Sequence, residues 1–266
     1  MTGQPLTTEL ILAKVAALKG LTPAIFYYDK QWFISDYIDG KNITLTKKSL
    51  LTKITISLKL MVRFHQLTEL SSSTRPEIST LNIADTLANI LGSSIFSNNK
   101  QQKLRNAFST LGDQIDTLIT AELHNTAFSP VCCHGDINFS NVLTDKNNNT
   151  WLIDFEYGCF APAEYDLAMF IAVNSIPLAH VTLCLDLYEQ QANSPLNKQL
   201  LYYFILLSYL INGLWYLEHS LNKVSTVNPK AQGAHHQFAT KQWQAFDTLY
   251  RHLNLPSKDI ELHPFI

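Results

Sequence analysis

The residues with the clearest chemical potential lie close together in the middle of the chain. The tripeptide His134-Gly135-Asp136 is followed by Asn141, five positions after Asp136, and Asp154 ends a short apolar run further on. Carboxylate and amide oxygens suit Mg²⁺, which usually takes one or two carboxylates together with phosphate oxygens. Phosphoryl transfer requires positioned phosphates, cationic charge and a carboxylate beside the attacking hydroxyl. The pattern therefore predicts a site that holds Mg²⁺ and a nucleotide phosphate.

Each of these polar side chains has an expected role. Asp136 orients the acceptor hydroxyl and accepts its proton, Asn141 helps to hold one Mg²⁺, and Asp154 bridges the metal to the phosphates. An Asp followed by an Asn five positions later, and then by another Asp, is the protein-kinase arrangement. Asp and Asn are also common in loops for local reasons, so the spacing alone is a weak signal. The complete set, which includes His-Gly-Asp, Asn-Val-Leu and Ile-Asp-Phe-Glu-Tyr, is far more specific.

Taken together, the motifs H-G-D-x-x-x-x-N-V-L, I-D-F-E-Y and Y-D-L-A resemble the aminoglycoside phosphotransferase and choline kinase superfamily over nearly the whole chain. The extension Glu156-Tyr157 is similar to choline/ethanolamine kinases and bacterial thiamine kinases. The resemblance implies a small-molecule kinase that transfers the γ-phosphate of ATP to a small alcohol with Mg²⁺. It also implies that His134, Asp136 and Asn141 are catalytic and that Asn141 and Asp154 are metal ligands.

The fold implied by the resemblance is α+β, a protein-kinase-like bilobal fold with a truncated N-terminal β-lobe. Residues 1–38 would form a partial N-lobe, and residues 39–266 would form a large, mostly helical C-lobe that carries the catalytic loop and the metal-binding hairpin. The hinge near residues 35–38 would meet adenine through its backbone. We therefore expect Asp36, Tyr37 and Ile38 to bind the nucleotide.

Three further residues are expected to support the nucleotide or the catalytic loop. Glu9 is the plausible helix glutamate of a kinase. His65 resembles the L-x-x-L-H position, where it would brace the catalytic loop, although a lone histidine on an apolar helix is more often a core residue. Asp166 begins a predicted helix, so we expect an ordinary N-terminal cap that also fixes the loop after Asp154.

The acceptor is expected to be a cationic alcohol of the choline, ethanolamine or thiamine type. Trp215 follows Gly-Leu in a segment that resembles a choline kinase segment with two tryptophans, the first of which is replaced here by Asn212. Trp215 could contact a cationic group through its ring, and Glu156 could supply charge. Asn138 could also reach the acceptor. The alternative is that Trp215 is plain core on a buried helix.

Two kinase features are not found before Glu9, namely a glycine-rich phosphate loop and a strand lysine. Gly3 is the only glycine before Gly20. We expect that the start lies upstream in a truncated reading frame, because the acidic set is intact. The chain could instead be a degenerate, inactive relative, or another element could replace these strands. The rival to a kinase is thus a pseudokinase-like module that binds a cationic ligand without phosphotransfer.

The elements that must position these residues can be read from hydrophobic periodicity and turn residues. The first helix should be capped by Thr7 or Thr8, end at Gly20, and bury Leu10, Ile11, Val15 and Leu18. Helices are predicted at residues 7–19, 49–67, 83–91 and 100–124, from 164 to 173, and in broken stretches to about 253. Strands are predicted at residues 24–28, 31–37, 131–133, 141–144 and 150–153. The turn residues Asp29-Lys30 and 145–149 predict that the first two and the last two of these strands form hairpins. Asp39-Gly40 should turn the chain, and a loop should follow Asp154 as far as Pro162.

Composition limits the remaining classes of function. The 266 residues carry 20 basic and 22 acidic side chains without a Lys/Arg cluster along the sequence, which argues against nucleic acid as a partner. The apolar stretch 200–217 contains Tyr, Ser, Asn and Gly, so a buried helix is expected rather than a membrane span. The four cysteines lack disulfide or metal spacing, which predicts reduced thiols in a cytoplasmic protein. The oligomeric state is left open.

Overall fold

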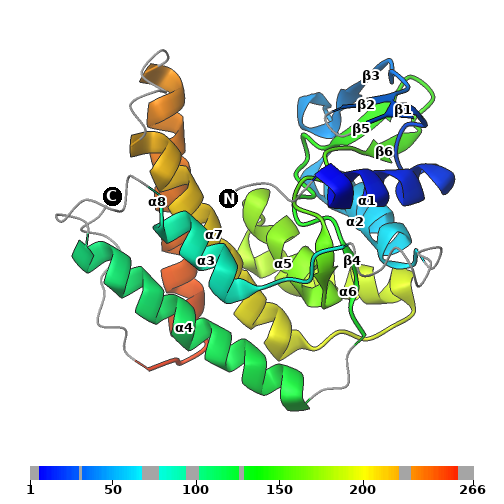
Figure 1. The fold of residues 1–266 in the computed structure, drawn as a ribbon. Helices are drawn as coiled ribbons and strands as arrows, with labels where there is room; N and C mark the ends of the chain where they lie inside the picture. Colours follow the sequence, from blue (N-terminus) through cyan, green and yellow to red (C-terminus); the bar gives the residue numbers. More distant parts are fainter. Residues whose placement is uncertain are drawn as a thin grey trace. The chain divides into compact units, whose positions relative to one another are not determined.

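The computed structural model describes residues 6–29, 32–67, 78–93, 102–125, 129–221 and 229–256 (Figure 1). The chain divides into two compact units. The first, called the mixed unit here, comprises Gly3–Leu81 and Phe128–Lys198, and the second, the helical unit, comprises Met1–Thr2, Asn82–Ala127 and Gln199–Ile266. This division is made by spatial contacts, and the expected lobe boundary at residue 38 stays a prediction.

The mixed unit combines helices with three small sheets. Its helices are α1 (Leu6–Leu18), η1 (Ile43–Leu45), α2 (Leu50–His65), α5 (Ala163–Val173), η4 (Leu178–His180) and α6 (Val181–Ala192). Its strands are β1 (Ile25–Tyr28), β2 (Phe33–Ser35), β3 (Gly40–Asn42), β4 (Val131–Cys133), β5 (Val142–Asp145), β6 (Thr150–Leu152) and β7 (Cys159–Ala161). Figure 1 shows β1, β2, β3, β5 and β6 gathered at one end of this unit, with α1 beside them.

Two hairpins were predicted, and both are confirmed. β1 pairs with β2, and β5 pairs with β6, both antiparallel. The turn of the second hairpin is built on Asp145, whose Oδ1 accepts hydrogen bonds from the amides of Asn147 and Asn149, both at 2.8 Å. Residues 30 and 31, at the tip of the first hairpin, lie outside the described part of the chain.

Two strands were not predicted. The expected turn at Asp39-Gly40 is wrong at Gly40, which begins β3 and pairs with Asp145 of β5. A Cβ at position 40 would lie 2.6 Å from the carbonyl oxygen of Thr144, so glycine allows the close approach of the two strands. β7 lies within the expected loop and pairs with β4. The residues of β3 are Gly-Lys-Asn, and β7 lies between Gly158 and Pro162, so neither segment has the apolar composition and flanks that predict a strand.

The helix ends follow local capping rules in part. Ser49 caps α2 by accepting a hydrogen bond from the amide of Thr52 at 3.2 Å. Gly20, with φ of +61°, follows the end of α1 as expected. The predicted cap at Thr7 or Thr8 is wrong, because α1 begins at Leu6 and both threonines lie inside it.

The predicted buried face of α1 is also wrong. Leu18 is 77% exposed, whereas Leu12, Ala13 and Ala16 are buried together with Thr8. The helix carries apolar residues on all its faces, so the hydrophobic periodicity does not indicate which face packs against the protein.

The helical unit contains four long or medium helices among its described residues. They are α3 (Ile83–Leu91), α4 (Gln102–Asn125), α7 (Lys198–Leu221) and α8 (Pro229–His252). In the described chain, α7 is the one helix long and apolar enough to cross a membrane, and 78% of its apolar window is buried inside the protein. The predicted buried helix is thus confirmed. In this unit Phe108 of α4 stacks on Trp243 of α8, with 5.5 Å between the ring centroids.

We expect two helical glycines to respond in opposite ways to alanine. A Cβ at Gly213 would collide with the indole of Trp243, whereas nothing lies within 4 Å of a Cβ at Gly233. Gly213→Ala should lower the free energy of unfolding by about 1–3 kcal/mol. Gly233→Ala should raise it by about 0.4–1 kcal/mol through reduced freedom of the unfolded chain.

Chemical denaturation of both variants measures these changes. Equal effects of the two substitutions would contradict the packing of α7 against Trp243.

Candidate active site

The loop that follows β4 carries the predicted catalytic residues. Gly135 has φ of +77°, and a Cβ there would collide with the carbonyl oxygen of Tyr157, so the turn after His134 depends on glycine. The amide of Asn138 donates to the carbonyl of Asp136 at 2.8 Å, and the amide of Asn141 donates to the carbonyl of Asn138 at 2.8 Å. These bonds curl the segment, so that the side chains of Asp136 and Asn141 meet.

Asp136 and Asn141 form a direct pair. Nδ2 of Asn141 donates to Oδ2 of Asp136 at 2.9 Å and to the carbonyl oxygen of Asp136 at 3.0 Å. This use of the amide nitrogen leaves Oδ1 of Asn141 as an oxygen donor, with a 3.4 Å bond from the Ser140 hydroxyl. Burial, and then the charge of Asp154, raises the pKa of Asp136 to about 7.

Asp154 is joined to this loop through the residue before it. The amide of Ile153 donates to the carbonyl of Asn141 at 3.0 Å. Asp154 itself has φ of +71°, a left-handed conformation that is uncommon for residues other than glycine. Asp154, after β6, is thus held next to Asn141, before β5, as a site shared by the two loops requires.

His134 is held inside the loop rather than directed outwards. Its Nε2–H donates to the carbonyl of Ile153 at 3.1 Å, and its Nδ1 accepts the amide of Asp136 at 3.3 Å. His134 is fully buried, and burial lowers its pKa, so the neutral ring fits both bonds. The ring therefore connects the backbone beside Asp136 to the backbone beside Asp154.

Two glutamates add negative charge to the same region. Glu9 on α1 has a raised pKa, first because of burial and then because of the charges of Asp154 and Glu156. The charge of Glu156 also raises the pKa of Asp136. α1 reaches this loop directly, since a Cβ at Gly158 would collide with Leu12. The site is therefore an acidic cluster whose members repel one another when no cation is bound.

Asp166 does not cap α5, and the expected cap is wrong. The N-cap position is Pro162, which makes no side-chain capping bond. The buried Asp166 carboxylate instead accepts the amide of His134 at 3.0 Å and the amide of Gly135 at 2.9 Å. It fixes the loop before Asp136 rather than the loop after Asp154.

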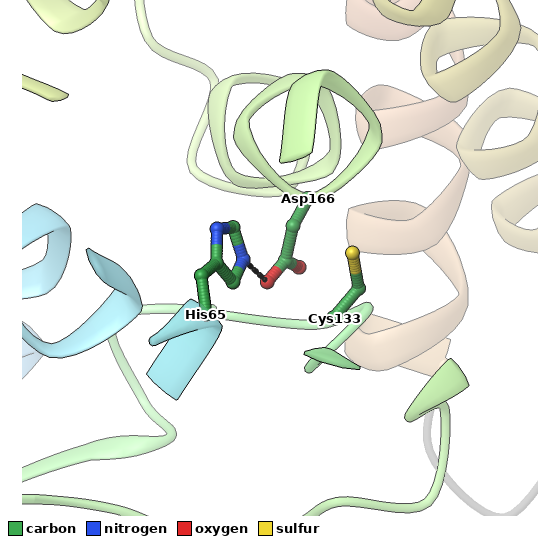
Figure 2. A group of neighbouring side chains, drawn as sticks. All are labelled: His65, Cys133 and Asp166. Carbon is green, nitrogen blue, oxygen red and sulfur yellow. Dashed lines mark hydrogen bonds and ion pairs between the residues drawn. The ribbon is translucent and has the colours of Figure 1, made fainter. Parts of the chain in front are cut away.

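His65 completes this arrangement from α2. Its Nε2–H donates to Oδ2 of Asp166 at 2.9 Å (Figure 2). The hydroxyl of Tyr188 on α6 lies 2.8 Å from Nδ1 of the same ring. Burial alone would raise the pKa of Asp166, but the hydrogen bond and charge of His65, and then the backbone amide of His134, hold it below the ordinary value. Helices α2 and α5 and the catalytic loop therefore meet at one carboxylate, and α6 joins them through the contact of Tyr188 with His65.

Cys133 lies beside this pair, as Figure 2 shows. Ligand atoms of His65, Cys133 and Asp166 lie within 4.8 Å of one another, a spacing that could suit a metal. Both ring nitrogens of His65 and both carboxylate oxygens of Asp166 are already engaged in hydrogen bonds. The Cys133 thiol faces the carbonyls of Ala161 and Pro162, each at 3.6 Å. The cluster is therefore satisfied as a hydrogen-bonded brace.

Two bracing residues were missed from the sequence. Tyr188 lies on α6, where its hydroxyl contacts His65. Asn174, directly after α5, accepts the amide of Phe139 at 2.8 Å and donates to the carbonyl of Ile137 at 2.9 Å. Neither residue belongs to a motif, and only the packing of α5 and α6 brings them to the loop.

The predicted nucleotide segment lies between β2 and β3. The amide of Asp36 donates to the carbonyl of Ala24 at 2.8 Å, so this amide is already used within the protein. Tyr37 is 88% exposed, and Ile38 is half-buried. The backbone groups that remain for a base are those of Tyr37 and Ile38.

The predicted acceptor residues are spread over both units. Oδ1 of Asn138 accepts the amide and the hydroxyl of Ser140 at 2.9 and 3.0 Å. Glu156 lies in the mixed unit with the acidic cluster. Trp215 is half-buried on α7 of the helical unit, where its ring stacks on His219 with 3.7 Å between centroids. Its contact with an acceptor stays a prediction.

The family model for choline/ethanolamine kinases matches residues 5–226 of this chain. A similar solved structure, a choline/ethanolamine kinase family protein from Mesorhizobium loti, is 14% identical with a TM-score of 0.67, and the match covers 94% of this chain and 80% of that one. A choline kinase from Cryptosporidium parvum is 18% identical with a TM-score of 0.69, covering 93% and 80% of the two chains.

A spectinomycin phosphotransferase solved with ADP and spectinomycin is 16% identical with a TM-score of 0.57, covering 91% of this chain and 83% of that one. A search of curated proteins finds no match. The predicted α+β, kinase-like fold and the predicted superfamily are confirmed.

Asp166→Asn should lower the free energy of unfolding by about 3–5 kcal/mol, because an amide cannot accept both loop amides and the His65 donor. Since the folded-state pKa of Asp166 lies below its ordinary value of 3.8, the wild-type advantage should be complete above pH 3.8. It should be lost as the pH falls through the folded-state pKa.

Urea denaturation at several pH values provides the measurement. The matched control is Asp186→Asn, an exposed position on α6, which should change stability by less than about 0.5 kcal/mol. Equal effects at positions 166 and 186 would show that Asp166 does not hold the loop.

Proposed function

This chain belongs to the choline/ethanolamine kinase family, and from this premise we propose that it transfers the γ-phosphate of ATP to the hydroxyl of a small cationic alcohol of the choline, ethanolamine or thiamine type. The observation that carries the proposal is the pairing of Asp136 with Asn141, on a loop joined by a backbone hydrogen bond to the residue before Asp154. These are the three positions that the kinase pattern requires.

The donor set fits Mg²⁺. Asn141 offers an amide oxygen and Asp154 a carboxylate, and both are hard ligands. The pKa values of Asp136 and Glu9 are raised first by burial and then by the neighbouring carboxylates, and a divalent cation would offset this negative charge. Asn141 and Asp154 would hold the ion, which neutralises charge on the phosphate oxygens when it is bound.

Asp136 is the residue proposed to act on the acceptor. Its carboxylate is fixed by Nδ2 of Asn141, so the remaining oxygen can accept a hydrogen bond from an alcohol and then its proton. His134 and Asp166 are proposed as positioning residues, because their polar groups bind the loop backbone and not an open space. Glu9 is proposed to support the nucleotide side of the cluster.

The remaining assignments rest on the family. The backbone of Tyr37 and Ile38, within the Asp36–Ile38 hinge, is proposed to meet the adenine base, between a partial N-lobe of residues 1–38 and a C-lobe of residues 39–266. Asn138, Glu156 and Trp215 are proposed to contact the acceptor. The four cysteines are free and buried, which favours a reducing compartment such as the cytoplasm.

Asp136→Asn should lower kcat for ADP formation with Mg-ATP and the best acceptor by about 10²- to 10⁴-fold, because the amide cannot take the proton of the hydroxyl. The KM for ATP should change little. A coupled ADP assay with choline, ethanolamine and thiamine measures both constants, and Asp186→Asn serves as the exposed control.

The rival function is a binding module that holds a cationic ligand without transfer. In that case calorimetry would detect choline binding that survives Asp154→Asn, while wild type forms no ADP with any acceptor. Asparagine is the suitable replacement at position 154, since it tolerates the left-handed backbone found there.

Glu156→Gln and Trp215→Leu should each raise the KM for choline by about three- to thirtyfold, the range expected for loss of a cation–π or charge contact. The uncharged tert-butyl analogue of choline should be affected much less, because it has no cationic group. Steady-state kinetics with both alcohols measures the difference, with Trp32→Leu, at a 69% exposed position, as the aromatic control. An equal loss for both alcohols would mean that these side chains recognise shape and not charge.

A further inference from the structure

A hollow in the mixed unit lies at the turn end of the β5–β6 hairpin, lined by residues other than those of the acidic cluster. Its volume is about 570 Å³, and its walls are β3, the segment that follows η1, and the β5–β6 turn. A hollow of this size lies within the range of small-molecule sites. Thr144 is three residues beyond Asn141 along β5, roughly 10 Å at the usual rise of a strand.

Four lysines from three separate segments line this hollow. Lys41 belongs to β3, Lys47 and Lys48 follow η1, and Lys146 begins the β5–β6 turn. Within the described chain the ammonium groups of these four lysines make no hydrogen bond or short ion pair, although the charge of Lys146 acts on neighbouring Asp145. Their convergence gives the hollow a local positive charge that is absent from the chain as a whole.

The two acidic side chains in the walls cancel only part of this charge. Both oxygens of Asp145 are used by its own turn, with Oδ1 accepting two backbone amides and Oδ2 accepting Nδ2 of Asn149 at 3.0 Å. Asp39 is a single exposed carboxylate at the rim. Four ammonium groups therefore share the hollow with two carboxylates, which leaves a net local charge of +2.

Thr144 supplies an independent sign of a missing partner. Its side chain is 8% exposed, it lines the hollow, and its Oγ1 has no hydrogen-bond partner in the structure. Thr144 is directly opposite Lys41 in the β3–β5 ladder, so the two side chains lie on the same face of the sheet. A buried hydroxyl without a partner is unfavourable, and it is satisfied if a ligand oxygen lies beside Lys41.

A solvated surface would explain part of this arrangement but not all of it. Adjacent lysines such as Lys47 and Lys48 ordinarily extend into water and need no ligand. An unpartnered, buried hydroxyl on a residue that lines a hollow together with Lys41 and Lys146 is not expected of such a surface. Ammonium groups and a hydroxyl donor together match the oxygens of a phosphate group.

We propose that this lysine-lined hollow is a binding site for a compact, multiply charged phosphate compound, separate from the acidic cluster. The phosphate oxygens would accept hydrogen bonds from Lys41, Lys47, Lys146 and the Thr144 hydroxyl. The site requires no Mg²⁺, because the lysines already supply the positive charge. The proposal does not depend on which alcohol the acidic cluster phosphorylates, or on whether it phosphorylates one.

Calorimetric titration of the full chain with inorganic pyrophosphate, in the absence of Mg²⁺, tests the site. Lys47→Gln and Lys146→Gln should each weaken binding about tenfold, as expected for loss of one charge-assisted hydrogen bond. Lys59→Gln, at an exposed position of α2 outside the hollow, should change the affinity by less than about twofold. Equal affinities in all three variants, or no binding to wild type at millimolar pyrophosphate, would overturn the proposal.

Thr144→Val gives a second readout that does not involve charge. The variant keeps the shape of the side chain and removes the unpartnered hydroxyl, so its Tm without ligand should be unchanged or higher. Its affinity for pyrophosphate should nevertheless fall about three- to tenfold. An unchanged affinity would mean that the hydroxyl does not face the ligand, against the proposal.

Two further arms identify the place and source of the phosphate. ATP added before the titration should leave the pyrophosphate affinity unchanged, and displacement by ATP would assign the anion to the nucleotide site and overturn the proposal.

Co-sedimentation with phosphatidylglycerol vesicles separates a lipid headgroup from a free phosphate. Vesicle binding that is lost in Lys47→Gln and Lys146→Gln, but not in Lys59→Gln, would support the same site with a lipid as its source.

Discussion

The buried carboxylate of Asp166 is the point on which the geometry of the acidic site depends. A charge removed from water is tolerated only when hydrogen-bond donors surround it, and here the donors are His65 and the amides of His134 and Gly135. The donors come from α2 and from the loop after β4, while Tyr188 of α6 lies against His65. The requirement to satisfy one anion thus holds three helices and the catalytic loop in a single arrangement.

Two residues with a left-handed backbone lie at the acidic site. Gly135 has a positive φ, and a side chain there would strike the Tyr157 carbonyl, so the position requires glycine. Asp154 also has a positive φ, although it is not glycine. Such conformations persist only where the surroundings fix them, and they are typical of functional sites. His134 provides that constraint, since its ring binds the backbone on both sides of the cluster. Rigid positioning is what phosphoryl transfer requires of a protein, because the chemistry itself needs little covalent help.

The β5–β6 hairpin joins two regions of opposite charge. At its open end Asp136, Asp154, Glu9 and Glu156 repel one another, as the raised pKa values of Asp136 and Glu9 indicate. At its turn end the lysines gather around Thr144. A net charge of −2 for the whole chain conceals this separation. The two ends are therefore suited to different ligands, a cation at the first and a phosphate anion at the second.

The sequence by itself determined the local features of this protein. Local sequence predicted the ends of α3 and the two hairpins. It also predicted that Asp136 and Asn141 share one loop and that Asp154 follows the second hairpin. The family followed from the same motifs.

Only the tertiary structure decided the face that α1 buries, the strands β3 and β7, and the partners of Asp166. It also brought Tyr188 to His65 and gathered the lysines around Thr144. These features join residues far apart in the chain, and local propensity carries no information about which distant segment will pack, pair or donate a hydrogen bond.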